Sequence, residues 1–269
     1  MKRILLFLFA ATITATVNAQ QKPERTATND AASMNNGQNP TDRIDTDKGP
    51  LTIQPIHHAA MVLTWNGKAI YVDPYGGGAA YRNMKPANVV LITDIHPDHL
   101  DSATLASINM EGATFIAPKA VAEQMPQLKE RIRILNNGES LELDGIKYTA
   151  VAMYNLPEAP DAMHTKGRGN GYVLEMGGKR VYIAGDTEDI PEMRQLKNID
   201  VAFVPMNLPY TMDVNQAASA VLEFKPKIVY PYHYRGKDGL SDVESFKKQV
   251  NDGDKTIDVR LRDWYAKSE

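Results

Sequence analysis

The stretch "TDIHPDHLD" (residues 93–101) places two histidines and three aspartates within nine positions of a chain that contains only six histidines. It directly follows the apolar run "ANVVLI" (residues 87–92), which predicts a buried strand. Other donors of the same kind also lie beside apolar runs: Asp186 follows "VYIAG", His233 follows "KIVYPY", and His164 precedes "GYVLE". Loops at one end of a rigid sheet are where functional side chains can converge without disrupting a core.

Nitrogen and carboxylate donors from segments remote in sequence are what a divalent cation requires. In a D-x-H-x-D-H turn, the first two donors can face one cation while the last two serve a second. The sequence therefore predicts a metal site with the ligands Asp94, His96, Asp98, His99, His164, Asp186 and His233. The alternative is that the two histidines of the turn cap a helix starting at Asp101, with the acids as favourable charges at its N-terminus. The chain has no cysteine, so only nitrogen and oxygen ligands are available.

The N-terminus carries the pattern of a secretory signal peptide. Lys2 and Arg3 precede an apolar stretch from Ile4 to about Val17, and small residues precede Ala19. We therefore expect residues 1–19 to be a cleavable signal peptide and the protein to be periplasmic or secreted; an uncleaved N-terminal anchor is the alternative.

Composition limits the partners of the chain. The net charge is −3 and no basic run is present, so charge gives no argument for binding nucleic acid or an anionic membrane. We expect a small-molecule substrate, no nucleic acid, and no stable membrane anchor once the signal peptide is removed. The oligomeric state is left open.

Residues 20–50 contain no aromatic residue, and their only large aliphatic residues are Met34 and Ile44. Such a segment buries too little apolar surface to offset its ordering entropy, so it is predicted to be a flexible linker. Residues 51–269 then form one folded domain.

Short strand-like runs alternate with amphipathic helical segments in this domain. Asn66-Gly67 and Gly177-Gly178 mark two hairpins. Strands are predicted at 51–56, 59–65, 68–74, 87–93, 113–118, 131–135, 140–154, 170–185, 199–205 and 226–232. Helices are predicted at 101–110, 118–125, 214–224 and 241–250. This order favours an α+β fold in which two packed sheets carry helices outside, a four-layer αββα sandwich.

The folded region resembles the metallo-β-lactamase-fold hydrolases, and within them the branch of L-ascorbate-6-phosphate lactonase and N-acyl-phosphatidylethanolamine phospholipase D. The family pattern H-x-H-x-D-H matches "DIHPDH" (residues 94–99), followed by His164, by the aspartate of "AGDTE" and by the histidine of "YPYHY". The branch's early segment matches from His58 to Asp73-Pro74. The correspondence runs from about residue 56 to 235.

The resemblance implies two metal positions. Site one would use Asp94, His96 and His164. Site two would use Asp98, His99 and His233, and Asp186 would bridge both ions. The departure is Asp94, which stands where the family usually has histidine. A carboxylate is a harder ligand, so manganese or iron joins zinc as an expected metal, with zinc first.

Two divalent ions imply a hydrolase in which a metal-bound hydroxide attacks a lactone, ester, amide or phosphoester. Asp98 and Asp186 are the expected catalytic carboxylates. His58 is a further expected catalytic residue, as a hydrogen-bond donor close to the ions. The alternative is that His58 is a structural histidine at a strand edge whose ring is hydrogen-bonded within the fold. The alternative function is a non-catalytic metal-containing protein of the same fold that binds a small anion.

Substrate contacts are predicted from neighbours of the ligands. Lys166 and Arg168 flank His164 and could hold a phosphate or carboxylate, or be solvated loop residues. Asn155 and Tyr210 lie in segments expected near the metals. The glycine-rich loop 75–83 could border the cleft. His57 is expected to be structural. Asp73 is expected to bond a ligand or the turn that follows it.

Overall fold

The computed structural model describes residues 41–265, so the predicted signal peptide (1–19) and residues 20–40 of the predicted linker lie outside the described residues. Two seven-stranded sheets form the described fold. The first has the order β1(Asp42–Ile44), β2(Leu51–His57), β3(Ala60–Trp65), β4(Lys68–Val72), β5(Val89–Leu91), β6(Thr114–Ala117), β7(Ile132–Ile134). The second has the order β16(Asp258–Val259), β13(Ile228–Tyr232), β12(Val201–Pro205), β11(Lys179–Ile183), β10(Gly169–Met176), β9(Ile146–Met153), β8(Ser140–Leu143).

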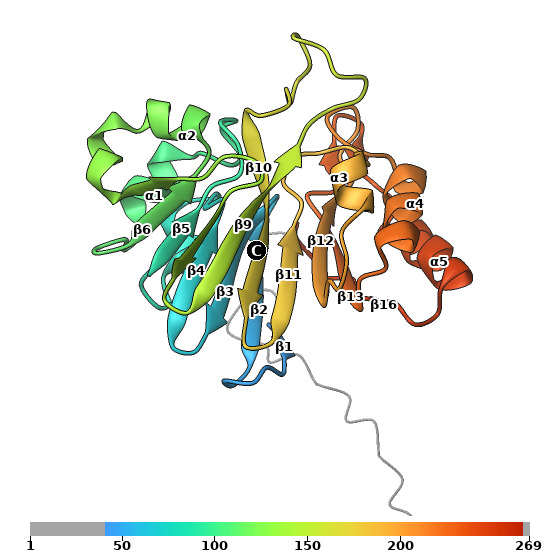
Figure 1. The fold of residues 1–269 in the computed structure, drawn as a ribbon, viewed down its shortest axis with the longest axis horizontal. Helices are drawn as coiled ribbons and strands as arrows, with labels where there is room; N and C mark the ends of the chain where they lie inside the picture. Colours follow the sequence, from blue (N-terminus) through green and yellow to red (C-terminus); the bar gives the residue numbers. More distant parts are fainter. Residues whose placement is uncertain (1–40, 266–269) are drawn as a thin grey trace, which may run out of the picture. The chain divides into compact units, whose positions relative to one another are not determined.

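Helices cover the outer face of each sheet, which confirms the predicted αββα arrangement (Figure 1). The helices α1(Ser102–Ser107) and α2(Lys119–Gln124), with the 3₁₀ turns η1(Gly78–Tyr81) and η2(Pro126–Arg131), accompany the first sheet. The helices α3(Pro191–Arg194), α4(Val214–Phe224) and α5(Val243–Gly253) accompany the second. A small ribbon of β14(Arg235–Gly236) and β15(Gly239–Leu240) follows β13. No helix within residues 41–265 has the length and apolar character needed to cross a membrane.

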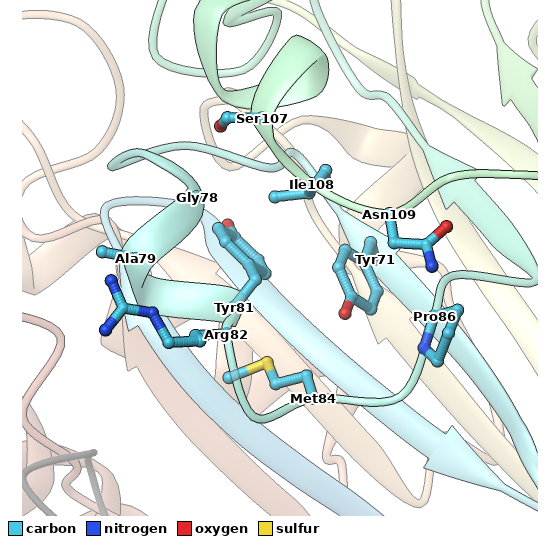
Figure 2. Close-up of a pocket in the computed structure, with 10 residues that line it drawn as sticks. All are labelled: Tyr71, Gly78, Ala79, Tyr81, Arg82, Met84, Pro86, Ser107, Ile108 and Asn109. Atoms are coloured by element: carbon cyan, nitrogen blue, oxygen red, sulfur yellow. The ribbon is translucent and has the colours of Figure 1, made fainter.

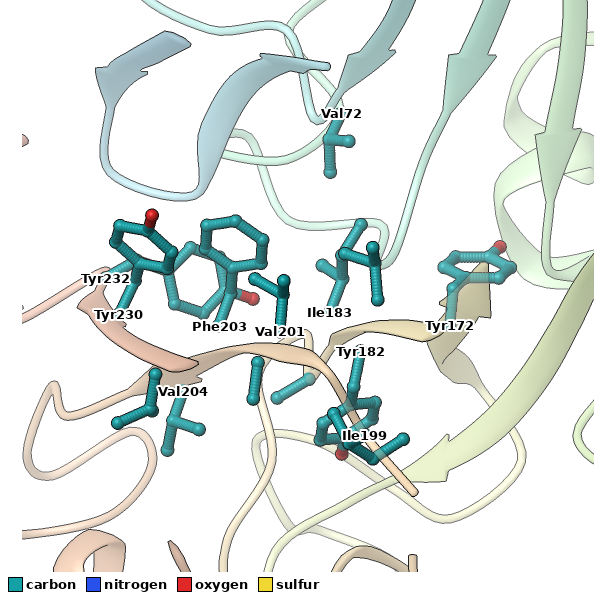
Figure 3. Close-up of a cluster of buried hydrophobic side chains, with 14 of the residues drawn as sticks. Val72, Tyr172, Tyr182, Ile183, Ile199, Val201, Phe203, Val204, Tyr230 and Tyr232 are labelled. Carbon is teal, nitrogen blue, oxygen red and sulfur yellow. The ribbon is translucent and has the colours of Figure 1, made fainter. Parts of the chain in front are cut away.

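The main core lies between the two sheets and continues under α4 and α5. Alternate residues of the central strand β12 serve the two faces of the second sheet. Phe203 points toward the first sheet, where Val72 faces it, while Val204 points the other way (Figure 3). This is why the strand reads as continuously apolar: both of its faces are buried.

Strand direction decides where the functional loops lie. The strands β4, β5, β6 and β7 run parallel to one another, as do β11, β12 and β13. The carboxyl ends of neighbouring parallel strands meet at one edge of a sheet, where ligands of open α/β sheets bind. The segments carrying the predicted metal ligands follow β5, β11 and β13, and one precedes β10, which is antiparallel to β11.

The ordered domain begins before Leu51, so the C-terminal end of the predicted linker is wrong. Strand β1 pairs with β2. Ile44 is buried in the core, and the carboxylate of Asp42 accepts hydrogen bonds from Tyr230 and Arg262 at 2.6 Å each. Composition failed to predict this order because the strand is held by tertiary contacts. One buried isoleucine and one hydrogen-bonded aspartate are enough to order it.

One further element prediction needs correction, and several short elements were not predicted. The predicted strand 140–154 is two strands, β8 and β9, separated by a tight turn at Asp144 and Gly145, both with positive φ (55° and 76°). The short elements η1, η2, α3, β14, β15 and β16 were not predicted. They are too short to show a periodic pattern of their own.

Candidate metal centre

The turn after β5 is held by backbone bonds that leave its histidines free to face inward. The His99 N–H donates to the His96 carbonyl at 2.9 Å. Helix α1 is capped by Asp101, whose carboxylate accepts from the Ala103 N–H at 3.0 Å and from the Thr104 hydroxyl at 2.6 Å. The alternative in which the histidines cap this helix is therefore wrong, since Asp101 alone supplies the side-chain cap.

Folding brings the predicted ligands together in three groups. In each group, one donor atom per residue lies within 4.8 Å of the others. The groups are Asp94, His96 and His164; His99, Asp186 and His233; and His58, Asp98 and His233. The first group is the set expected for site one. The second holds two of the residues expected for site two together with the expected bridge, Asp186.

Asp73 determines how His99 is oriented. Its Oδ2 lies 2.9 Å from Nδ1 of His99, and both side chains are fully buried. Thr93 holds the carboxylate in place, with its N–H donating to Oδ1 at 2.8 Å and its hydroxyl to Oδ2 at 2.6 Å. Nδ1 of His99 therefore carries a proton, and Nε2, which offers a lone pair once it is deprotonated, faces Asp186. As expected, Asp73 bonds a predicted ligand.

Asn155 does the same for His164. Its Nδ2 donates to the Tyr210 carbonyl at 2.8 Å, so its Oδ1 faces His164 and accepts from the His164 N–H at 2.8 Å. Nδ1 of His164 lies 3.1 Å from the same oxygen and donates to it. Nε2 of His164 is left as a lone pair. Asn155 thus contacts a predicted ligand, whereas we expected it to contact substrate.

These two ring nitrogens face one carboxylate. Nε2 of His99 and Nε2 of His164 each lie 3.4 Å from Oδ2 of Asp186. Both nitrogens are buried and neither has a hydrogen-bond partner among residues 41–265. Two imidazole nitrogens and a carboxylate oxygen that face one another across this distance are stabilised by a positive charge between them, which a proton or a cation supplies. The residues therefore fit divalent cations, and Oδ2 of Asp186 lies between His164 of the first group and His99 of the second.

The pKa values of two buried histidines are raised because the carboxylates of the centre place negative charge beside them. Burial opposes a charge on His233, but Asp186 and Asp98 outweigh it and raise the pKa of His233 to about 9. Burial likewise opposes protonation of His99, yet Asp186 and Asp73 raise its pKa well above the usual value. Burial alone would raise the pKa of Asp186, but His233 and His99 lower it well below the usual value. A site of this kind binds a proton or a metal ion.

Asp94, the residue that departs from the family pattern, has a partner of its own. Arg168 donates to its two oxygens from Nε at 3.2 Å and from Nη2 at 3.1 Å. Oδ2 of Asp94 also lies 2.6 Å from Nδ1 of His96 and 3.8 Å from Nε2 of His164. The guanidinium thus competes with any cation for this carboxylate.

His58 lies at the edge of the centre. Its ring centroid is 5.2 Å from that of His233, and its Nδ1 is 3.2 Å from the Tyr265 hydroxyl. Burial, followed by the charge of His233, lowers the pKa of His58 to about 4, so the ring is neutral at pH 7. His57 instead donates through Nδ1 to the Trp264 carbonyl at 3.2 Å, which agrees with the structural role expected for it.

Backbone strain is concentrated at this centre. The non-glycine residues His58, Asp73 and His233 all have positive φ, between 41° and 50°. Such conformations persist where surrounding bonds impose them, as the His233 N–H to His58 carbonyl bond does at 3.2 Å. The strain is consistent with side chains that are aimed at a common point.

A cavity of about 380 Å³ opens onto the three groups. Several predicted ligands and the predicted substrate residue Tyr210 line it. The full lining is His58, His96, Pro97, Asp98, Met163, His164, Asp186, Asn207, Tyr210, His233, Arg235 and Gly236. Lys166 and Arg168 do not line it. Lys166 pairs with Glu192 at 3.1 Å and with Glu158 at 3.2 Å. In this arrangement, neither of the two cations predicted to hold substrate faces the cavity.

The glycine-rich loop 75–83 also lies differently from the prediction. Only its first residue approaches the centre, where Tyr75 stacks on His57 with ring centroids 5.8 Å apart. Most of the rest, from Gly78 to Arg82, includes η1 and borders a separate cavity of about 570 Å³, where the ring of Tyr81 stacks on that of Tyr71 (Figure 2). None of the residues around that second cavity belongs to the three groups.

Several residues of the centre could hardly be predicted from local sequence patterns. Thr93 adjoins the ligand turn, but its bond to Asp73 spans 20 positions. Tyr265 lies 207 positions from His58. Met163 directly precedes the predicted ligand His164, and this adjacency was a cue that the sequence offered.

Comparison with known proteins agrees with this geometry. Residues 52–233 match the sequence profile of the family described as "Beta-lactamase superfamily domain". The chain is 31% identical over 212 residues to a UPF0173 metal-dependent hydrolase of Pyrococcus abyssi, covering 74% of this chain and 92% of that protein.

Solved structures show the same likeness. A protein of Parabacteroides distasonis described as a metal-dependent hydrolase has a TM-score of 0.73 and 40% identity, over 82% of this chain and 97% of that one. A metallo hydrolase of Ignicoccus hospitalis has a TM-score of 0.68 and 26% identity, over 78% and 94% of the two chains.

Proposed function

Since this chain belongs to the β-lactamase superfamily and is a metal-dependent hydrolase, we propose that it hydrolyses a small-molecule lactone, ester, amide or phosphoester at two divalent cations. The observation that carries this proposal is the convergence of two imidazole nitrogens, Nε2 of His99 and Nε2 of His164, each 3.4 Å from Oδ2 of Asp186. One ion would lie with Asp94, His96 and His164, and the other with His99, Asp186 and His233.

Cations held there would polarise a substrate oxygen and lower the pKa of a bound water. The residues of the chain supply the rest. Asp73 and Asn155 fix the rings of His99 and His164, so each ligand nitrogen is already oriented before binding. Zinc suits the nitrogen donors, and the extra carboxylate of Asp94 makes manganese or iron the alternatives.

Asp98 and His58 face the cavity and would act on the reacting groups. The side chain of Asp98 is 34% exposed, and its hydrogen bond to His233 outweighs the effect of burial and keeps its pKa well below the usual value. It is an ionised acceptor that can orient a water. The Tyr265 hydroxyl accepts from the Arg235 N–H at 3.1 Å and can donate its own proton to Nδ1 of His58. His58 then presents its Nε2–H as a hydrogen-bond donor to a developing oxyanion.

Metal content and activity together test this function. We expect wild type to bind two equivalents of metal by elemental analysis and to hydrolyse at least one class among lactones, phosphodiesters and acyl amides. His99→Ala should lose at least one equivalent and about 100-fold or more in kcat/KM. His57→Ala is the matched control, since His57 lies at the same edge but bonds the Trp264 carbonyl. Metal-free wild type, or equal activity in His99→Ala, would contradict the proposal.

We also propose that the enzyme acts in the periplasm or outside the cell. Lys2, Arg3 and the apolar stretch that ends before Ala19 support export. N-terminal sequencing of the protein from a periplasmic or culture fraction should give Gln20 as the first residue. Recovery of the protein only in the cytoplasm, with Met1 retained, would contradict export.

A further inference from the structure

The cavity beside the metal groups is lined by an arginine that has no acidic partner within residues 41–265. Arg235 lines this cavity together with Asp98 and Met163. At the same edge of the fold, Arg168 is paired with Asp94 and Lys166 with Glu192. Within residues 41–265, Arg235 forms no ion pair, and its guanidinium instead lies 4.8 Å from the ring centroid of Tyr265. A charge placed in a cavity without a counter-ion is available to a ligand.

The backbone holds Arg235 in a fixed position. The Arg235 N–H donates to the Tyr265 hydroxyl at 3.1 Å, and the Lys237 N–H donates to the Leu208 carbonyl at 2.9 Å. Between them, Gly236 packs so closely on Leu208 that a Cβ there would collide with the Leu208 carbonyl oxygen. The arginine follows the predicted ligand His233 by two residues, so its backbone is fixed close to one ligand of the metal groups.

The closest neighbours of Arg235 are neutral. Burial raises the pKa of the Tyr265 hydroxyl above its usual value, so this group is not an anion at neutral pH. The rings around Tyr265 are those of Tyr234, with centroids 4.9 Å apart, and of His57 and His58, each 5.2 Å away. Aromatic and imidazole faces hold a guanidinium in place without neutralising it.

The net charge of the metal-loaded centre also favours an anionic ligand. Arg168 already balances Asp94, which leaves Asp98 and Asp186 as the uncompensated carboxylates of the three groups. Two divalent cations exceed the charge of two carboxylates. The cavity of the metal-loaded enzyme is therefore positive at the metal groups and again at Arg235, and such a field favours anionic ligands.

We propose that Arg235 binds a carboxylate or phosphate group of the substrate, so that the substrate is a small anionic ester, lactone, amide or phosphoester. This inference rests on the proposed hydrolase function. A planar guanidinium bonds either anion through two parallel N–H groups, which fixes the orientation of the substrate and its distance from the metal groups. Met163, with 49% of its surface exposed, offers an apolar contact in the same cavity.

Anion binding to the zinc-loaded full chain tests this assignment. Inorganic phosphate and succinate are titrated separately into wild type, Arg235→Gln and Lys237→Gln by isothermal calorimetry. Lys237→Gln is the matched control, because it removes the same charge from an exposed residue two positions away that does not line the cavity. We expect the tighter-binding anion to lose about tenfold or more in affinity in Arg235→Gln and less than about twofold in Lys237→Gln.

The same samples separate this proposal from the proposed function. Bound metal is counted in each variant, and the titrations are repeated on the protein as purified. Equal affinity in wild type and Arg235→Gln, equal losses in the two variants, or no binding of either anion to wild type would overturn the role of Arg235. Wild type that binds no metal would overturn the hydrolase mechanism, whereas an intact metal count with unchanged anion affinity would overturn only the Arg235 assignment.

Discussion

Oδ2 of Asp73 and Nδ1 of His99 lie 2.9 Å apart, both fully buried and 26 positions apart in the sequence. The contact joins the end of β4 to the turn after β5. It decides which nitrogen of His99 carries a proton and which faces Asp186. A residue that binds no metal itself thus determines how a metal ligand is presented.

Asp73→Asn should weaken zinc affinity by about 10- to 100-fold, because the amide removes the charge that orients His99 and increases its basicity. Competition with a chromophoric chelator measures the change. Asp101→Asn is the control, since Asp101 caps α1 and does not belong to the metal groups. Equal zinc affinity in wild type and Asp73→Asn would show that the contact has no effect on the ligand.

Arg168→Gln should increase metal affinity at the group of Asp94, His96 and His164 by about tenfold, since a bidentate competitor for the Asp94 carboxylate is removed. The metal-free protein should become less stable, because Asp94 is then buried without its counter-ion. Metal titration followed by urea denaturation with and without metal measures both effects. Lys119→Gln, which removes an exposed charge on α2, is the control. Weaker metal binding in Arg168→Gln would mean that the arginine supports this group.

The metal-free protein should lose stability as the pH rises from about 6.5 to about 9. The folded pKa of His233 is raised to about 9 by Asp186 and Asp98 against the effect of burial, while the unfolded value is about 6.5. The protonated ring therefore stabilises the fold fully below about pH 6.5, and this contribution, on the order of 3 kcal/mol, disappears as the pH passes through 9.

Urea denaturation of chelator-treated protein across this pH range measures the trend. Zinc should reverse it, because cations bind the deprotonated ligands. His233→Ala should flatten the slope and His57→Ala should keep it. A free energy of unfolding that rises with pH in metal-free wild type would contradict the linkage.

A chain that begins at residue 51 should be less stable than one that begins at residue 41 by about 2 kcal/mol or more. It loses the burial of Ile44 and the bonds that Tyr230 and Arg262 donate to Asp42. Urea denaturation at matched protein concentration compares the two chains. In the chain that begins at residue 41, Asp42→Asn separates the contribution of the charge from that of the strand. Identical denaturation midpoints for the two chains would show that residues 41–50 do not stabilise the domain, as the linker predicted from composition requires.

The sequence by itself determined the fold class and the metal-dependent hydrolase family, and it selected residues that the fold brings together in three groups. The reason is that two features of the sequence are local: the apolar runs that predict strands and the turn that carries several donors. Apolar runs such as 87–92 report burial on both faces of a strand, and a donor placed immediately after such a run must lie at the edge of the sheet. The turn 94–99 carries four donors in one short segment, so little about its neighbours had to be known.

Only the tertiary structure decided what each donor contacts. Arg168 meets Asp94 across 74 positions, and Tyr265 meets His58 across 207. Strand β1 is ordered because Tyr230, 188 positions away, bonds Asp42. Lys166 and Arg168 are predicted to hold substrate because they lie close to His164 in the sequence. In the structure, Lys166 pairs with Glu192 and Arg168 pairs with Asp94. Arg235 lines the cavity instead. A periodic pattern records which side of an element is buried, and pairing across the fold depends on packing that no local pattern encodes.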